Sequence, residues 1–193
     1  MASNYYAMLF RMKYIRRWAL MRNLKEETLS EHSLETAFIA HCLAVIENRR
    51  FGGTLNADAI AVAALFHDAA EVITGDLPTP VKYYNNEIKT AYKEIEAAAE
   101  QKLIDLLPAD LREDFLPICH PDSETERYVK AADKLSALIK CREELALGNR
   151  EFEAAAAASE QAITALGLRA ADVFLEEFMP AFLRGLDESI AGI

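Results

Sequence analysis

Residues that break helices are scarce in this sequence, which has only 7 glycines and 6 prolines among its 193 residues. Alanine, leucine, isoleucine and glutamate are plentiful by contrast, and most of these are strong helix formers. No segment alternates apolar and polar residues over a useful length, which is the pattern of a half-buried strand. These features disfavour a sheet protein and predict an all-α fold.

Cysteine is also rare, and long apolar runs are missing. The three cysteines are odd in number and show no paired spacing, so we interpret them as reduced, mostly buried thiols. No apolar run approaches the roughly 20 residues that a membrane helix needs. The N-terminus lacks the basic-then-apolar layout of a signal peptide. We therefore expect a cytoplasmic protein that does not bind a membrane.

Basic residues are outnumbered by acidic ones, 21 to 31, and the net charge of −10 argues against binding of nucleic acid polymers. The basic residues are unevenly spread, because residues 1–25 contain six of them and no acidic residue. This segment could attract a small anionic substrate, or it could simply balance acidic helices nearby. Composition alone does not separate the two interpretations.

The length suits one domain over residues 1–193, and no linker, repeat or low-complexity tract divides the chain. Capping boxes at Thr28 and Ser123 and a cap at Asn56 mark helix starts. Residues 74–80 contain two prolines and one glycine, which excludes a regular helix there. The expected helices cover about residues 3–13, 29–48, 57–72, 85–106, 123–147, 150–166 and 169–190, the last kinked near Pro180.

The adjacent pair His67-Asp68 is the most informative feature, because it lies in a run otherwise built from small and apolar residues. Burying such groups costs on the order of several kcal/mol unless they are paired or bound to a metal. His32 lies upstream of the pair and Asp133 downstream, each in an expected helix. This order predicts one divalent metal held by two imidazoles and two carboxylates from several helices.

Two nitrogen and two oxygen ligands suit Mn, Fe, Co, Ni, Cu or Zn better than Ca or Mg, and they select no single ion among the six. One ion is predicted because the chain has only four histidines. His41 lies nine residues after His32, about 180° around the same expected helix. His120 precedes Pro121 in an expected loop. We therefore interpret His41 and His120 as lying outside the site.

Three neighbouring features could complete an active site. Glu71 lies four residues after His67, on the same face of the expected helix, and could orient or deprotonate an attacking water. Arg17 offers a bidentate phosphate clamp, and Trp18 offers a flat face for a base or sugar. The proline-stiffened loop Asp76–Thr79 could hydrogen-bond a sugar or phosphate. Taken singly, Arg17 and Trp18 also fit a core tryptophan beside a solvated arginine, and the loop also fits an ordinary turn.

Together these features resemble the HD-domain phosphohydrolase superfamily and, more closely, the YfbR-like bacterial 5′-deoxynucleotidases. The segments that carry the resemblance are residues 17–18, 21–23, 30–34, 67–71, 74–83 and 130–133. The order of histidines and aspartates is shared across the superfamily, whereas the Gly-Asp-Leu-Pro-Thr-Pro-Val-Lys-Tyr run with the upstream Arg-Trp is much more specific. The resemblance spans about residues 5–190 and implies a compact HD-domain helical bundle with a metal site between helices.

The resemblance implies hydrolysis of deoxyribonucleoside 5′-monophosphates to deoxynucleoside and phosphate by metal-activated water. The implied metal ligands are His32, His67, Asp68 and Asp133. The implied catalytic residues are Glu71, which positions the water, Asp68, and Arg17, which orients the phosphate. The implied substrate contacts are Arg17, Trp18, Asp68, Asp76, Leu77, Pro78 and Thr79, with Trp18 against the nucleotide and its sugar and Asp76 near the sugar hydroxyl. Members of the family typically accept several bases and form homodimers.

Three alternatives stay open on the sequence. One is a phosphohydrolase of the same superfamily that acts on a cyclic nucleotide, a nucleoside triphosphate or a guanosine alarmone, although a single short basic segment favours a small monophosphate. Another is a sensing or scaffold protein that keeps the fold without catalysis. Such proteins are expected to lose a metal ligand or the glutamate, and all are present here. The third is a helical interaction module without metal, with the acidic surface as its partner-binding face.

Overall fold

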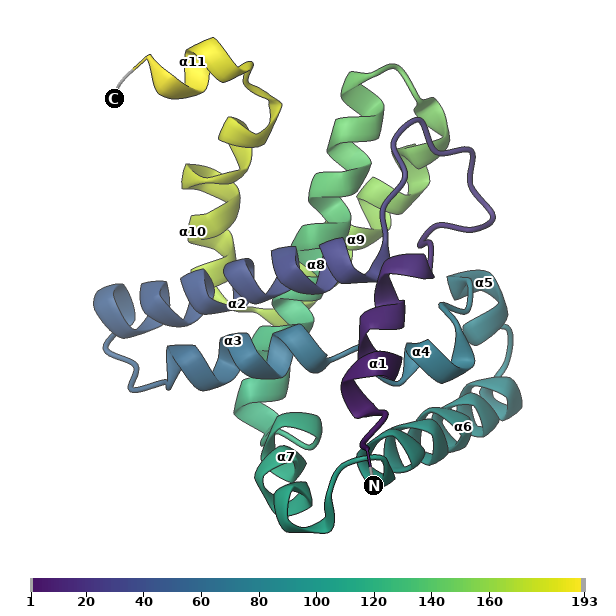
Figure 1. Cartoon of the computed structure of the whole chain (residues 1–193). Helices are drawn as coiled ribbons and strands as arrows, with labels where there is room; N and C mark the ends of the chain where they lie inside the picture. The colour runs from purple at the N-terminus through teal and green to yellow at the C-terminus, as the bar shows by residue number, and fades with distance from the viewer. Residues whose placement is uncertain (1, 192–193) are drawn as a thin grey trace.

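The computed structural model describes residues 2–191, which form helices and connecting loops, so the all-α prediction is confirmed (Figure 1). Its α-helices are α1 (Tyr5–Leu9), α2 (Leu29–Phe51), α3 (Ala57–Phe66), α4 (Glu71–Thr74), α5 (Thr79–Lys82), α6 (Asn86–Asp105), α7 (Arg112–Cys119), α8 (Ser123–Ala146), α9 (Glu153–Leu166), α10 (Arg169–Glu177) and α11 (Leu186–Ile190). Short 3₁₀ turns cover Phe10–Tyr14, Ala109–Leu111, Arg150–Phe152 and Met179–Leu183. Within residues 2–191, no helix combines the length and apolarity needed to cross a membrane.

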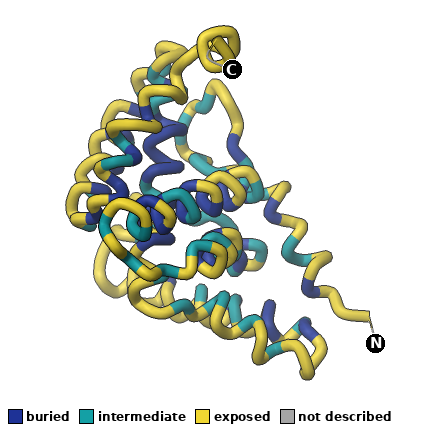
Figure 2. Tube along the Cα trace, turned by 90° about the vertical axis from the view of Figure 1, so that its left-hand side faces the viewer, coloured by how far each residue is buried: buried dark blue, intermediate teal, exposed yellow. Residues whose placement is uncertain are grey.

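The interior is built around α2, α3 and α8, with α9 and α10 packed against them. Leu43, Ile60, Leu138 and Ile163, one from each of α2, α3, α8 and α9, are almost fully buried. A smaller apolar cluster around Tyr5 joins α1 to α6 and α7. Figure 2 shows buried residues running through the interior of the bundle, while exposed residues cover its outside and both ends. Burial of these apolar side chains supplies the main stabilisation of the fold.

Helix caps fix where α2 and α6 begin, and both starts agree with the prediction. Thr28 Oγ1 accepts a hydrogen bond from the Glu31 amide at 3.3 Å, and the Glu31 carboxylate accepts one from the Thr28 amide at 2.7 Å. The Asn85 side chain accepts a hydrogen bond from the Ile88 amide at 2.8 Å at the start of α6. The cap of α2 places His32 in the first turn of that helix, where it is fully buried.

The prediction of one helix over residues 57–72 is wrong, because α3 ends at Phe66 and residues 67–70 form a turn before α4. The His67 side chain explains the break. Its Nδ1 atom lies 2.7 Å from the carbonyl of Ala64, which is the acceptor that the Asp68 amide would use in a continued helix. His67 and Glu71 therefore do not share a helix face as predicted.

The remaining differences from the prediction lie at helix ends. Asp122 caps α8 in place of the expected capping box at Ser123, because its carboxylate accepts a hydrogen bond from the Thr125 amide at 2.7 Å. The expected first helix is divided into α1 and a 3₁₀ turn. The expected last helix is divided into α10, a 3₁₀ turn that contains Pro180, and α11. Pro80 is tolerated in α5 because it lies in the first turn.

The loop of residues 15–28, which carries Arg17 and Trp18, is fastened to the C-terminal part of α8 (Figure 1). Buried Glu144 of α8 accepts hydrogen bonds from two consecutive loop amides at 3.0 and 2.9 Å, and it pairs with Lys140 at 2.5 Å. Burial raises the pKa of Glu144, but the hydrogen bonds outweigh this effect and lower the pKa to about 2. The helix that carries a predicted metal ligand therefore also anchors the loop.

Candidate active site

The four predicted metal ligands come from α2, the turn after α3, and α8. One side-chain atom from each of His32, His67 and Asp68 lies within 4.8 Å of the other two. Asp68 Oδ2 is 3.1 Å from His67 Nε2 and 3.8 Å from His32 Nε2. Asp133 lies beside this group, with Oδ1 3.2 Å from His32 Nε2 and Oδ2 2.7 Å from the Lys134 ammonium. The fold therefore brings together residues that are up to 101 positions apart in the sequence.

Both imidazoles are oriented as metal-binding histidines are. His32 Nδ1 lies 3.1 Å from the Ser136 hydroxyl, and His67 Nδ1 lies 2.7 Å from the Ala64 carbonyl, so Nε2 of each ring faces the cluster. Both Nε2 atoms are buried and have no hydrogen-bond partner among the described residues, although carboxylate oxygens lie nearby. An unsatisfied buried nitrogen is unfavourable, and a cation would satisfy both. The donor set therefore fits a divalent metal.

The charges in the cluster perturb one another strongly. Burial lowers the pKa of His67, but the charge and hydrogen bond of Asp68, the charge of Asp133 and the hydrogen bond to Ala64 together outweigh burial and raise the pKa to about 9. Burial disfavours ionisation of Asp68, but the charge and hydrogen bond of His67, together with the charge of His32, outweigh it and lower the pKa of Asp68 to about 2. Burial and the Arg17 charge lower the pKa of His32, which keeps this imidazole neutral, as a metal ligand must be. Ionised carboxylates beside a neutral imidazole favour a bound cation.

Glu71 enters the site as the first residue of α4. Its side chain is buried, and its Oε2 atom has no hydrogen-bond partner among the described residues. Burial and the negative charges of Asp68 and Asp76 raise the pKa of Glu71 to about 9. The carboxyl group therefore lies within electrostatic reach of both aspartates, where it can hold or accept a proton beside the cluster.

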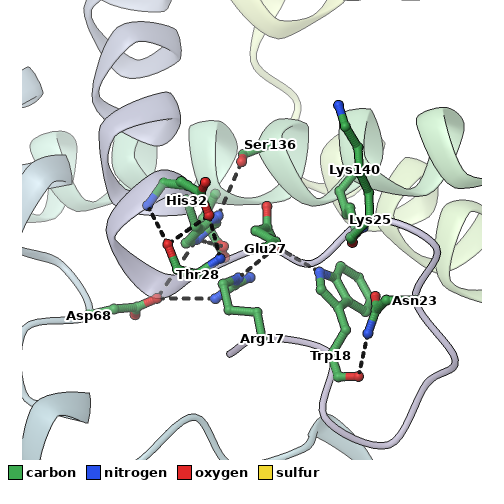
Figure 3. Close-up of polar contacts among 12 residues, drawn as sticks. Arg17, Trp18, Asn23, Lys25, Glu27, Thr28, His32, Asp68, Ser136 and Lys140 are labelled. Atoms are coloured by element: carbon green, nitrogen blue, oxygen red, sulfur yellow. Dashed lines mark hydrogen bonds and ion pairs between the residues drawn. The ribbon is translucent and has the colours of Figure 1, made fainter. Parts of the chain in front are cut away.

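Arg17 links the cluster to the loop (Figure 3). Its Nη1 atom is 3.5 Å from Asp68 Oδ2, and its Nε atom donates a hydrogen bond to Glu27 Oε2 at 3.1 Å. The same Glu27 oxygen accepts a hydrogen bond from the indole N–H of Trp18 at 2.8 Å. The Trp18 ring packs against Phe152, with ring centroids 5.3 Å apart. Trp18 therefore does contact the core, as the simpler interpretation expected.

A cavity of about 590 Å³ lies beside the cluster, within the size range of small-ligand sites. Asp76, Pro78 and Thr79 line it, whereas Leu77 does not. Arg17 connects the cavity to the predicted metal ligands. The full lining comprises Arg17, Trp18, Ala19, Leu20, Met21, Asp76, Pro78, Thr79, Pro80, Tyr83, Asp133, Lys134, Ala137, Ala155, Ala158, Ser159 and Ala162.

The sequence analysis did not predict several residues of the site, namely Ser136, Glu27 and the small residues of α9. Ser136 follows Asp133 by three residues in α8, so helix spacing could have indicated it. The alanine-rich run of α9 was predicted only as helix, and its place on the cavity wall follows from its packing on α8. Glu27 precedes the cap of α2 and carries no local signal of its contacts.

The other two histidines lie away from the cluster, as predicted. His41 Nε2 is 3.5 Å from Asp58, and His120 Nδ1 is 3.9 Å from Glu100. Their side chains are 46% and 61% exposed, whereas that of His32 is fully buried. Only two imidazoles are therefore available to the cluster, which favours one metal over two.

Replacement of Ser136 with alanine is expected to weaken metal binding by about 10- to 100-fold, because the hydroxyl is the Nδ1 partner that orients His32. The metal Kd of chelator-treated protein, measured by competition with a fluorescent chelator, checks this expectation. Ser189→Ala in exposed α11 is the control. An unchanged Kd in Ser136→Ala would show that the hydroxyl does not orient the ring.

The helical bundle brings His32, the His67-Asp68 turn and Asp133 of α8 together beside a cavity of about 590 Å³. This combination defines an HD-type metal-dependent phosphohydrolase. The family described as 5′-deoxynucleotidase YfbR-like matches residues 4–182. The chain belongs to this family.

Known proteins of the family and fold resemble the chain over nearly its whole length. A 5′-deoxynucleotidase YfbR of Photorhabdus temperata is 51% identical over 189 residues, which is 96% of each chain. An HD-domain phosphohydrolase of Listeria innocua is 25% identical, with a TM-score of 0.83 over 95% of this chain and 90% of that one. The cyanophage S-2L HD phosphohydrolase DatZ, solved with dA and one catalytic Zn²⁺ ion, shares the fold at 17% identity, with a TM-score of 0.61 over 91% and 95% of the two chains.

Proposed function

We propose that this protein is a 5′-deoxynucleotidase that hydrolyses deoxyribonucleoside 5′-monophosphates to deoxynucleoside and phosphate. The position of Arg17 carries this proposal, because Arg17 lies 3.5 Å from Asp68 of the cluster and also lines the cavity. A phosphate bound by Arg17 would lie between the cluster and the cavity, with the nucleoside in the cavity. The 51% identity to a 5′-deoxynucleotidase supports the same activity.

The proposed metal ligands are His32, His67, Asp68 and Asp133, which would hold one divalent ion. When bound, such an ion lowers the pKa of a water molecule and neutralises charge on the phosphoryl group. The two available Nε2 atoms support a single ion. Mn, Fe, Co, Ni, Cu and Zn all suit this mixture of nitrogen and oxygen donors.

Three side chains of the protein, Arg17, Glu71 and Asp68, have separate roles in the reaction. Arg17 holds the phosphoryl oxygens through its Nη atoms, because its Nε atom is taken by Glu27. Glu71 positions the attacking water, since it offers a buried oxygen without another partner, and a divalent cation bound beside it would lower its pKa so that it can accept the proton of that water. Asp68 holds Arg17 next to the metal site. This arrangement supports in-line attack of water on phosphorus, with cleavage of the bond between phosphorus and the 5′-oxygen and return of the proton taken from the water to the departing 5′-oxygen.

The cavity walls account for the proposed substrate selectivity. Trp18 packs against the sugar and rejects a 2′-hydroxyl by steric clash or by leaving it without a hydrogen-bond partner. Asp76, Pro78 and Thr79 contact the nucleotide, with Asp76 near the sugar hydroxyl, whereas Leu77 lies off the cavity wall. Four alanine side chains of α8 and α9 offer no hydrogen-bonding groups, and Lys134 and Ser159 are polar side chains beside them. This largely apolar wall distinguishes poorly between bases, so several bases are accepted.

We further propose that the protein is a cytoplasmic homodimer that binds neither membranes nor nucleic acid polymers. Phe38, Phe182, Leu183 and Leu186 are large, exposed apolar residues, and Phe38 and Phe182 line one shared hollow. Burial of this surface against a second copy would be favourable. The three free cysteines suit a reducing compartment, and the net charge of −10 opposes polyanion binding.

Phosphate release from dAMP and AMP tests the proposed activity. Chelator-treated protein is assayed with Mn, Co, Zn, Mg or no metal restored, and we expect metal-dependent release from dAMP with little from AMP. Release from neither substrate, with metal bound, would overturn the proposed activity. Parallel assays with a cyclic nucleotide, dATP and a guanosine alarmone would then identify the alternative substrate. Equal release from dAMP and AMP would overturn the sugar selectivity alone.

Replacement of Trp18 with alanine is expected to lower the preference for dAMP over AMP by about 10-fold, because the wall that excludes the 2′-hydroxyl is removed. The ratio of kcat/KM values for the two substrates measures this effect. Leu20→Ala, also on the cavity wall, is the control for a general loss of packing. An unchanged ratio in Trp18→Ala would remove Trp18 from this role.

A further inference from the structure

Glu27 joins Arg17 and Trp18, two residues of the cavity wall (Figure 3). Its Oε2 atom accepts hydrogen bonds from Arg17 Nε at 3.1 Å and from Trp18 Nε1 at 2.8 Å. Its backbone carbonyl also accepts a hydrogen bond from the Arg17 amide at 3.0 Å. The Glu27 side chain is only 8% exposed and does not line the 590 Å³ cavity. Glu27 is therefore placed to orient neighbours rather than to touch a ligand in this cavity.

These contacts set the direction in which both neighbours face. With Nε held by Glu27, the guanidinium of Arg17 presents Nη1 toward the cluster. Trp18 has a φ of 61°, a left-handed conformation that residues other than glycine rarely adopt. Its carbonyl is held by the Met21 amide and the Asn23 side chain, and its ring nitrogen is held by Glu27. One carboxylate oxygen thus restrains both cavity-lining side chains.

We propose that Glu27 is a positioning residue that holds the phosphate-binding Arg17 and the sugar-facing Trp18 in one geometry, so that phosphate orientation and discrimination against a 2′-hydroxyl are coupled. This inference rests on the roles of Arg17 and Trp18 in the proposed function. Because both donors share one oxygen, a shift of that oxygen displaces both side chains. Loss of catalytic efficiency and loss of sugar selectivity should therefore occur together.

A purely structural role for Glu27 leads to a different expectation. Glu27 also compensates the charge of Arg17, whose side chain is only 13% exposed. If charge compensation were its only role, loss of Glu27 would lower stability or overall activity. The relative rates with dAMP and AMP would not change, because the two substrates carry the same phosphate. The ratio of the two rates therefore separates the roles.

The variant Glu27→Gln keeps the side-chain length but replaces the carboxylate with a neutral amide. Its matched control is Glu26→Gln, because Glu26 is adjacent, 62% exposed and paired with Arg16. We expect Glu27→Gln to lower kcat/KM for dAMP by about 10- to 100-fold and the dAMP-to-AMP ratio by about threefold or more, at unchanged metal content. The control should match the wild type. An unchanged ratio in folded Glu27→Gln overturns the proposal.

A double-variant cycle tests whether Glu27 acts on selectivity through Trp18. In a Trp18→Ala background, Glu27→Gln should still lower kcat/KM through Arg17, but it should leave the dAMP-to-AMP ratio unchanged. This is the non-additivity expected when one residue acts through another. Independent, additive effects of the two substitutions on the ratio would overturn the proposed coupling.

The single tryptophan of the chain provides a readout that does not depend on activity. The time-resolved fluorescence anisotropy of Trp18 should gain a fast component in Glu27→Gln and remain unchanged in Glu26→Gln. If Glu27→Gln does not fold, Glu27→Asp replaces it with the same expectations, because it keeps the charge and shortens the reach. An unchanged decay in the folded Glu27 variant overturns the positioning role.

The rates of the wild-type protein with dAMP and AMP distinguish failure of this inference from failure of the proposed function. A wild-type protein that releases no phosphate from dAMP would overturn the proposed function, and the coupling would fall with it. A wild-type protein that prefers dAMP, together with a folded Glu27→Gln variant of the same preference, would overturn the inference alone.

Discussion

Replacement of Glu71 with glutamine is expected to lower kcat for dAMP by about 10²- to 10⁴-fold while bound metal stays at the wild-type level. Among the described residues, the Glu71 carboxylate contains the one buried carboxylate oxygen that lacks a hydrogen-bond partner. Glutamine keeps its shape but cannot accept a proton from water. Glu71 also lies outside the group formed by His32, His67 and Asp68, so the metal site should survive.

Steady-state kinetics and elemental analysis on the same preparation check this prediction. Glu94→Gln, at an exposed position of α6, is the control for loss of a surface charge. The thermal midpoint of Glu71→Gln should be no lower than that of the wild type, since burial and the charges of Asp68 and Asp76 already disfavour the ionised form of Glu71. Loss of metal in Glu71→Gln would contradict the proposal and make Glu71 a ligand.

The parts of the site that local patterns determine were predictable from the sequence. The capping box at Thr28 predicted the start of α2 and so the position of His32 in its first turn. The His67-Asp68 pair stood out because polar groups are costly in an apolar run. The convergence of these residues with Asp133 followed from the resemblance and from the way helical proteins build metal sites.

The turn after α3 could not be predicted from periodicity. Apolar spacing continues through residue 72, and only the competition of a side chain for the Ala64 carbonyl ends the helix at Phe66. This competition has a functional result. It places His67 and Asp68 in a turn instead of a regular helix. The ring centroid of His67 lies 5.3 Å from that of His32, and Asp68 Oδ2 lies 3.8 Å from His32 Nε2.

Contacts between distant segments were equally inaccessible to local patterns. Glu144 holds loop residues 24 and 25 from about 120 positions away, as the two hydrogen bonds span 120 and 119 residues. Glu27 meets Trp18 across a loop whose path no propensity determines. The loop geometry therefore comes from tertiary contacts, whereas the helices that carry the ligands come from local sequence.

Replacement of Asp68 with alanine is expected to abolish stoichiometric metal binding and to lower kcat/KM by more than about 100-fold, since groups that only orient a ligand already contribute about 10- to 100-fold. Asp68 lies at the centre of the site, where Oδ2 is 3.1 Å from His67 Nε2, 3.8 Å from His32 Nε2 and 3.5 Å from Arg17 Nη1. Its loss also removes the carboxylate that faces both the Arg17 guanidinium and the imidazoles, which further opposes a cation in the site.

Elemental analysis and activity under increasing metal concentration test this prediction, with exposed Asp110→Ala as the control. Full metal content with lost activity would contradict a ligand role for Asp68.

Replacement of Asp133 with alanine provides a graded comparison. Asp133 lies outside the tightest group, and one of its oxygens is already paired with Lys134, so we expect a smaller loss of metal affinity than in Asp68→Ala. If the order of the two losses were reversed, Asp133 rather than Asp68 would be the dominant carboxylate of the site.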